Sequence, residues 1–164
     1  MQTHSVLAYP CAGAGIDTVE LLLFRLGGDA HGQHNELFGI HVVNVREIMA
    51  MPAVTALAGA APHVLGVINL RGQVTQVLDL PAMTGCKPAR GLNIMLVTEL
   101  GDATYAFAVE SVEEIVLLES SRVTGQHCAA AGVVAGFARL DDGAGSSRLA
   151  QVLDIAAIVG RFTG

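Results

Sequence analysis

Short apolar runs interrupted by glycine, aspartate and asparagine make up most of the chain. Runs of this length with alternating apolar and polar positions are typical of β-strands. They predict strands over 19–26, 36–49, 66–80 (two strands around a turn), 92–100, 103–118, 132–140 and 149–155. Residues 51–66 hold two prolines and predict a connecting loop, and residues 156–162 predict a short helix. The spacing of strands and turns indicates an all-β protein rather than alternating βαβ units.

The alternation changes phase inside the predicted strand 36–49. Ile40 and Val42 alternate with polar neighbours, whereas Val43, Val45 and Glu47 continue on the opposite phase. Because an uninterrupted strand keeps its phase, we expect a bend or β-bulge near Val43.

The pattern of the first half returns in the second half. Three pairs of segments match: "FGIHVVNVREI" at 38–48 with "YAFAVESVEEI" at 105–115, "VLGVINL" at 64–70 with "VAGFARL" at 134–140, and "QVLDL" at 76–80 with "QVLDI" at 151–155. The second copy carries five extra residues, which fall in "DDGAGSSR" at 141–148. The repeat predicts two related β lobes whose inner faces share a core.

An aspartate ends both "VLD" sequences and precedes a helix-prone segment. Asp79 and Asp154 therefore suit helix N-caps, where the carboxylate accepts backbone N–H bonds and complements the helix dipole. An acid/base pair of carboxylates is the alternative interpretation. Since the repeat explains both residues without catalysis, the N-cap is preferred.

Composition supports one packed domain and excludes some functions. The chain has 164 residues, 52% of them apolar and 4% aromatic, with 19 glycines and a formal net charge of −6. These values argue for a globular core rather than disorder. Nucleic-acid binders cluster their basic residues, whereas the nine here are scattered, so we expect no nucleic-acid partner.

The first residues and the cysteines bear on location. Residues 1–18 lack a clear period and predict a flexible leader before a domain over 19–164. No signal peptide and no bilayer-spanning run is evident, so we expect a cytoplasmic protein without direct membrane insertion. Cys11, Cys86 and Cys128 are widely spaced, which suits a reducing compartment better than a disulfide framework.

The sequence predicts no cofactor, no metal site and no catalytic residue, and hence no enzyme. His31 and His34 share a loop without a partner ligand at zinc-site spacing. No G-x-S-x-G motif occurs, and "CAGAG" at 11–15 lacks the context of a phosphate-binding loop. A small-ligand-binding β-barrel sensor stays open as an alternative function, although the Val-, Ala- and Leu-rich strands indicate a filled core.

Four stretches together resemble the CheW-like coupling proteins of bacterial chemotaxis: "FGIHVVNVREI", "GVINLRGQVTQVLDL", "YAFAVESVEEIV" and "VLDIAAIVG". The resemblance spans most of residues 19–162, and residues 21–72 look closest to the N-terminal CheW-like domain of CheV. In CheV a receiver domain follows the CheW-like domain. None follows within these 164 residues, so we expect either the CheW-like part of a CheV protein or a free-standing coupling protein.

The resemblance implies two small five-stranded β-barrel lobes packed side by side, with short helical segments, in an adaptor that performs no chemistry. Its implied partners are the helical cytoplasmic tip of a chemoreceptor (methyl-accepting chemotaxis protein) and the regulatory domain of the histidine kinase CheA, within membrane-associated receptor arrays. By position, it implies receptor contact by Arg71, Glu47 and Ile48. It implies kinase contact by Val45, Val54, Gly66 and Gly72.

Arg71 of "NLRG" is either a solvated turn cation or a binding residue. Gly72 permits a tight turn and Leu70 anchors it, and a rigid turn lowers the entropy an arginine loses on pairing with a carboxylate. Given the resemblance, we favour binding. In the second half, "LDD" places Asp141 where Arg71 would stand, so this alignment repeats the scaffold but not the charge.

One position departs from the family pattern. The family often has proline where this chain has Gln76. Proline carries no N–H, so Gln76 restores a backbone donor to this strand edge.

Overall fold

Two β-sheets and two short helices make up the computed structural model, which describes residues 17–29, 31, 35–125 and 132–163. Most of the predicted leader, Cys11, Cys128 and His34 lie outside these residues. The elements in chain order are β1 (Thr18–Arg25), β2 (Leu37–His41), η1 (Val42–Asn44), β3 (Val45–Ala50), β4 (Val64–Leu70), β5 (Gln73–Asp79), α1 (Leu80–Thr84), β6 (Ile94–Leu100), β7 (Ala103–Val109), β8 (Ser111–Glu119), η2 (Ser120–Arg122), β9 (Val123–Thr124), β10 (Val134–Asp141), β11 (Ser147–Leu153) and α2 (Ile155–Phe162).

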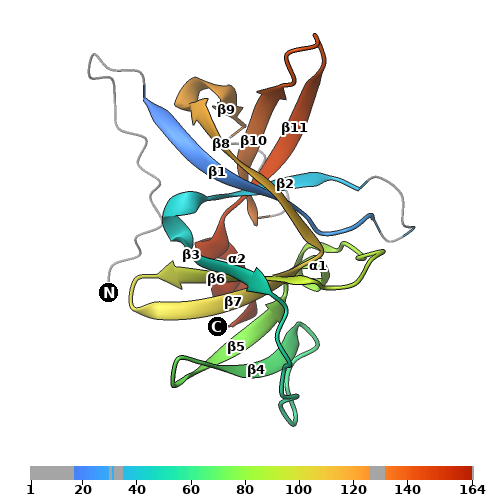
Figure 1. Ribbon diagram of the computed structural model, residues 1–164, viewed down its shortest axis with the longest axis vertical. Helices are drawn as coiled ribbons and strands as arrows, with labels where there is room; N and C mark the ends of the chain where they lie inside the picture. Colours follow the sequence, from blue (N-terminus) through green and yellow to red (C-terminus); the bar gives the residue numbers. More distant parts are fainter. Residues whose placement is uncertain (1–16, 30, 32–34, 126–131, 164) are drawn as a thin grey trace.

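The strands form two curved sheets, one above the other in Figure 1. Lobe 1 is the five-stranded sheet, with the order β3-β6-β7-β5-β4. Lobe 2 is the six-stranded sheet, with the order β8-β1-β2-β11-β10-β9. The predicted all-β architecture of two lobes is confirmed, and the two-residue strand β9 is the addition to the expected five strands of lobe 2.

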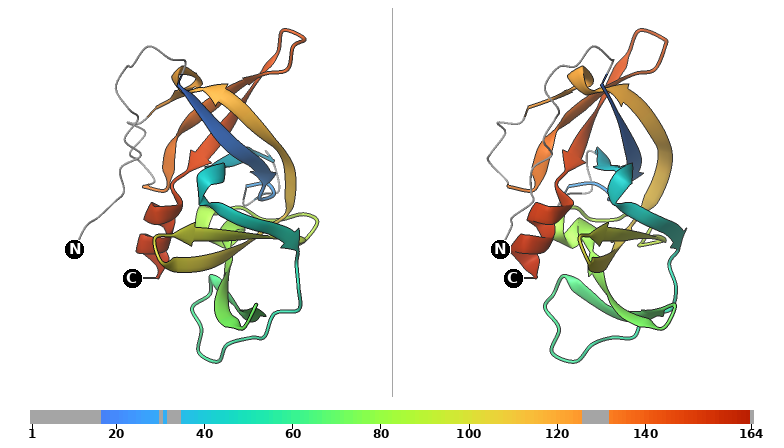
Figure 2. Two further views of the ribbon diagram at one scale, coloured as in Figure 1. Left: turned by 60° about the vertical axis from the view of Figure 1, so that its left-hand side comes forward. Right: turned by 90° about the vertical axis from the view of Figure 1, so that its left-hand side faces the viewer.

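Each lobe combines strands from both halves of the sequence. β2 pairs with β1 in lobe 2, but β3, which follows it, pairs with β6 in lobe 1. Likewise β7 pairs with β6 in lobe 1, and β8, which follows it, pairs with β1 in lobe 2. Figures 1 and 2 show both crossovers passing between the lobes. The two halves of the repeat therefore exchange strands, and neither half forms a lobe by itself.

The predicted break near Val43 is confirmed as the 3₁₀ turn η1, which carries the chain from lobe 2 to lobe 1. A β-bulge follows on β3, between Val45 and Glu47. The second half repeats this bulge on β8, where Val112 and Glu114 pair with consecutive residues of β1. The bulges shift the phase of both strands just after they enter their new sheet.

The shared core is also confirmed. Leu22 and Phe24 of β1 belong to a cluster between the lobes, whereas Leu21 and Leu23 point into lobe 2. In lobe 1 the interior is filled by Ile68, Val77, Met95, Val97, Ala106 and Ala108. Because both lobe interiors are packed with buried aliphatic side chains, neither resembles a ligand-holding barrel.

Both predicted helix N-caps are confirmed. Asp79 accepts a hydrogen bond of 3.0 Å from the Ala82 N–H, and Asp154 accepts one of 3.0 Å from the Ala157 N–H. The two carboxylates therefore cap the N-termini of α1 and α2, at the ends of β5 and β11, as the repeat indicated.

Candidate functional site

Arg71 and Gly72 form the two-residue turn between β4 and β5, closed by the pair Leu70 and Gln73. Both turn residues have positive φ, 52° for Arg71 and 84° for Gly72, as a type I′ turn requires. The Asn69 side chain accepts a hydrogen bond of 2.8 Å from the Gly72 N–H. The turn is thus held from within, and its tip carries a guanidinium group.

Arginine is an unfavourable residue at this place. Type I′ turns favour Asn or Gly at the first central position, and a residue with a long side chain in the left-handed region is strained. Among the described residues, Arg71 is the only non-glycine residue with positive φ. Its side chain is 64% exposed, so burial of its apolar atoms offsets little of the strain. This combination supports a functional rather than a stabilising role for Arg71.

The turn brings Arg71 to Glu47 of β3. Arg71 Nη2 lies 2.9 Å from Glu47 Oε2, within ion-pair distance but outside hydrogen-bond geometry. β3 and β4 are the two edges of the lobe 1 sheet, so the pair spans the gap where this lobe closes. A partly exposed pair of this kind stabilises a fold by no more than about 1 kcal/mol. Its main consequence is to orient the guanidinium group.

Ile48 lies on the opposite face of β3 from Glu47. Glu47 is paired in register with Val97, which points into lobe 1, whereas Ile48 is paired with Leu96, which belongs to the core between the lobes. Of the three predicted receptor residues, the structure therefore brings Arg71 and Glu47 together and places Ile48, 41% exposed, on the side facing lobe 2.

The four predicted kinase residues have different surroundings. Gly72 is exposed in the turn, and Val54 is half-buried against the lobe 1 core. Val45 packs against the core between the lobes, and Gly66 is buried. A Cβ atom at Gly66 would lie 2.1 Å from the Thr55 carbonyl oxygen, so its absence lets Thr55 pair with Val67 and close lobe 1. Kinase contact by these residues stays a prediction.

Lobe 2 holds a counterpart of the Arg71–Glu47 pair. Glu114, the repeat equivalent of Glu47, pairs with Arg148 of β11 at 3.2 Å. Asp141, which aligns with Arg71, pairs instead with Arg122. The arginine is therefore repeated in space, although it comes from the strand after the turn and not from the turn itself. The aligned sequences alone did not reveal this.

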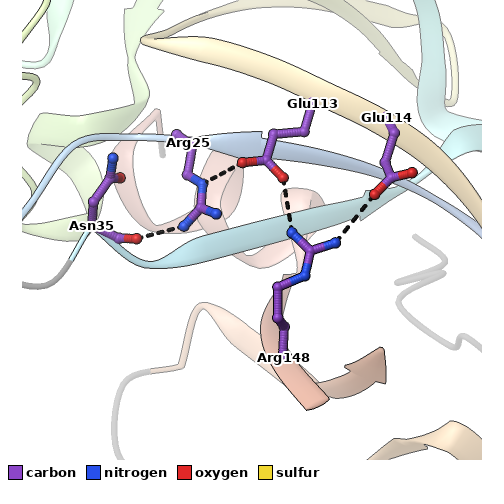
Figure 3. A network of polar contacts seen from close by, with 5 residues as sticks. All are labelled: Arg25, Asn35, Glu113, Glu114 and Arg148. Carbon is purple, nitrogen blue, oxygen red and sulfur yellow. Dashed lines mark hydrogen bonds and ion pairs between the residues drawn. The ribbon is translucent and has the colours of Figure 1, made fainter. Parts of the chain in front are cut away.

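Figure 3 shows the network that holds Arg148 in place. Arg148 Nη1 lies 3.2 Å from Glu113, whose other carboxylate oxygen accepts a 2.7 Å hydrogen bond from Arg25 Nε. Burial raises the pKa of the Glu113 carboxyl, but hydrogen bonds and charge from Arg25 and Arg148 outweigh it and hold the pKa below its ordinary value. Arg148 thus contacts two carboxylates, whereas Arg71 contacts one carboxylate among the described residues and has further N–H groups without an acceptor there.

An apolar surface that sequence reasoning missed lies along β3 and β8. Ile115 of β8 is the repeat equivalent of Ile48, is 54% exposed, and is paired in register with Leu22 of the core between the lobes. Val43 of η1 and Leu117 of β8 are also exposed. Figures 1 and 2 show β3 and β8 along the same side of the molecule. We call Val43, Ile48, Ile115 and Leu117 the β3–β8 face; the repeat alignment ending at Ile48 and Ile115 was the signal for it.

A hollow of about 450 Å³ borders this face, lined by the start of β1, the residues around η1 and Leu117. His41 contributes to its lining and is itself only 6% exposed. Its Nε2 has no hydrogen-bond partner among the described residues. Burial lowers the pKa of the His41 imidazole, and the negative charge of Asp154 opposes this only in part.

The buried His41 predicts a pH dependence of stability. Because its folded-state pKa lies below the unfolded value, the unfolded chain takes up a proton first as the pH falls. Stability is then full above the unfolded pKa of about 6.5 and declines below it. Urea unfolding at pH 5.0 to 7.5 should show this decline, and His41→Gln should flatten it. An equal slope in the variant would show that His41 is not the group responsible.

These features define a class of protein: a two-lobed β protein that presents a charged turn and an apolar face on its surface. The family model of the CheW-like domain matches residues 20–162, and the chain belongs to this family. The resemblance inferred from the sequence is thereby confirmed. Among the described residues, no helix is long and apolar enough to cross a membrane.

Individual relatives fit this family assignment. The chain is 32% identical over 99 residues to the probable chemotaxis protein CheW of Rhizobium etli, covering 59% of each. It is 29% identical over 104 residues to the chemotaxis protein CheV3 of Helicobacter pylori, covering 61% of this chain and 33% of that protein. The match to the first relative thus spans about three fifths of that relative's length. The crystal structure of the scaffolding protein TtCheW from Thermoanaerobacter tengcongensis matches with a TM-score of 0.71 at 20% identity, covering 85% of this chain and 91% of that one, which establishes the shared fold.

Proposed function

We propose that the protein is a non-enzymatic chemotaxis adaptor that couples the cytoplasmic tips of chemoreceptors to the regulatory domain of the histidine kinase CheA. The observation that carries the proposal is Arg71, held in a strained turn with its guanidinium group exposed beside Glu47. A pre-oriented, exposed arginine is typical of a binding hot spot. In this proposal the adaptor works in the cytoplasm, at membrane-associated receptor arrays.

Receptor helices would lie against the β3–β8 face, and a charged receptor group would pair with Arg71. The face offers four exposed aliphatic side chains from both lobes, so a bound helix would bridge the lobes. An amphipathic helix that buries its apolar side in this way contributes hydrophobic energy, and the arginine adds charge specificity. A change in the position of the helix would then alter its contacts with both lobes.

Kinase contact is proposed for the closing edge of lobe 1. Of the four predicted residues, Gly72 is exposed, Val45 and Val54 are half-buried, and the buried Gly66 would act by shaping this edge. We further propose that the domain is the CheW-like part of a CheV protein, which the match to CheV3 supports. Sequencing the gene past the codon for Gly164 tests this, because a CheV assignment requires a receiver domain there.

Co-sedimentation with receptor-containing membranes, with and without CheA, tests the coupling function. We expect the protein to sediment with receptor membranes and to increase the amount of CheA that sediments. If it binds neither receptor nor kinase, while a small metabolite raises its melting temperature, the ligand-sensor alternative replaces this proposal.

The variants Ile48→Glu and Ile115→Glu should each weaken receptor binding at least tenfold, because a charge would replace an apolar contact on the β3–β8 face. Both side chains are substantially exposed, so the folded state should tolerate the change, with melting temperatures within a few degrees of wild type. Leu149→Glu is the matched control, since Leu149 is at least as exposed as Ile48 and Ile115 but lies on β11. Equal loss of binding in all three variants would refute the assignment of this face.

A further inference from the structure

The two lobes form parallel strand pairs of three residues each, but at different positions along the aligned strands. In lobe 2, β11 and β2 pair at Ala150–Leu37, Gln151–Phe38 and Val152–Gly39. In lobe 1, β5 and β7 pair at Val77–Ala106, Leu78–Phe107 and Asp79–Ala108. The repeat aligns Val152 with Val77 and Gly39 with Ala106, so the register is the same. Thr75 and Gln76 therefore occupy positions that are paired in lobe 2 and unpaired with β7 in lobe 1.

Lobe 1 opens into a fork at this point, formed by Gln73–Gln76 of β5 and Ala103–Tyr105 of β7. Figure 1 shows the two strands diverging from the place where they pair. Both segments line a groove of about 560 Å³, together with His63 and the end of α2. A hydrogen bond of 2.8 Å joins His63 Nε2 to the Phe162 carbonyl oxygen and anchors α2 at one end of the fork.

The backbone of β5 presents free hydrogen-bonding groups to this groove. In a turn of the Arg71–Gly72 type, the Gln73 N–H bonds to the Leu70 carbonyl, and the ladder then alternates. Val74 and Gln76 consequently direct their N–H and C=O groups away from β4, toward β7. The Val77–Ala106 bridge uses the Gln76 C=O, so the Val74 N–H and C=O and the Gln76 N–H are the groups that reach the fork without a strand partner. An open strand edge of this kind is a template for an added strand.

The side chains around the fork favour a particular chemistry. Val74 is 73% exposed on β5, and the partly buried Tyr105 ring lines the groove from β7. Asp102, in the turn before β7, makes no hydrogen bond or ion pair with any described residue. The groove thus joins an apolar patch to an unpaired carboxylate, and its one lining histidine is already bonded to α2.

We propose that the fork of lobe 1 binds an extended peptide segment of a partner protein, which adds as a strand to the free edge of β5. Its backbone bonds to Val74 and Gln76, an apolar side chain packs against Val74 and Tyr105, and a lysine or arginine pairs with Asp102. Neither Arg71 nor any residue of the β3–β8 face lines this groove.

Selection of a displayed library of random heptapeptides on the immobilised protein tests the proposal, followed by amide NMR and fluorescence anisotropy with the selected peptides. We expect peptides with alternating apolar residues and a basic residue, and amide shifts confined to Val74, Gln76 and Ala103–Tyr105. Gln76→Pro removes the donor and should weaken binding at least tenfold, whereas Gln76→Ala keeps it and should stay within threefold of wild type. Asp102→Lys should weaken binding at least fivefold.

Failure of selection, amide shifts elsewhere, or equal binding by Gln76→Pro and Gln76→Ala would each overturn the proposal. If Gln76→Pro loses its dispersed amide spectrum, the amide shifts and Asp102→Lys decide the question. Ile115→Glu, on β8 of lobe 2, should leave peptide binding unchanged while it weakens receptor binding, so the outcome does not depend on the proposed coupling function.

Discussion

Gly66→Ala should lower the free energy of unfolding by about 3 kcal/mol. The added Cβ would lie 2.1 Å from the Thr55 carbonyl oxygen and 2.8 Å from Val54 Cγ1, and φ is +149°. The clash would disrupt the backbone pairing of Thr55 with Val67, which joins the segment after β3 to β4. For a chain of this size the melting temperature should drop by about 6–12 °C, measurable by calorimetry.

Gly59→Ala is the control that shows the cost of backbone strain without a steric clash. Gly59 also has positive φ, +72°, but nothing lies within 4 Å of a Cβ atom there. We expect it to cost about 1 kcal/mol. The repeat equivalent Gly136, whose Cβ would lie 2.8 Å from the Thr124 carbonyl oxygen, should give an intermediate loss. Similar losses for Gly66→Ala and Gly59→Ala would show that closure of lobe 1 does not depend on this close approach.

Arg71→Glu should weaken binding to receptor-containing membranes by about 30-fold or more, the usual cost of removing a hot-spot arginine. The new carboxylate would also face Glu47, the residue that now pairs with Arg71. Sedimentation of the variant with receptor membranes at several protein concentrations measures the change. Stability should change little, since the pair is partly exposed.

Two further variants make this result specific. Arg46→Glu changes the net charge equally on the adjoining strand β3, where Arg46 pairs with Glu99 at 3.0 Å, and should bind receptor within threefold of wild type. Arg71→Asn supplies a residue that the type I′ turn prefers, so it should fold at least as stably as wild type while losing receptor binding. Retained binding in Arg71→Asn would show that the guanidinium group is not the contact.

The site was only partly predictable. The pattern around "NLRG" indicated a tight turn presenting Arg71, and the family resemblance named Glu47, but their contact depends on the gap between the two edges of lobe 1. Ile115 could have been found from the repeat alone. Arg148 could not, because it aligns with no arginine and reaches Glu114 only through the curvature of lobe 2.

Most local elements could be predicted from the sequence: the alternating strands, the break at Val43, the turn at Arg71 and Gly72, and the N-caps Asp79 and Asp154. Each of these depends on neighbouring residues, whose side-chain periodicity and turn geometry act over a few positions. The prediction of one strand over 103–118 was wrong, because the chain leaves lobe 1 at Glu110 and divides into β7 and β8. The pairing of β3 with β6 rather than β2, and of β8 with β1 rather than β7, became visible in the three-dimensional structure alone. The same alternation of apolar and polar residues suits any strand partner of matching phase, so local pattern does not choose between partners. The exchange of strands between the lobes, the β3–β8 face and the open fork therefore follow from long-range strand pairing and from the burial of one shared core.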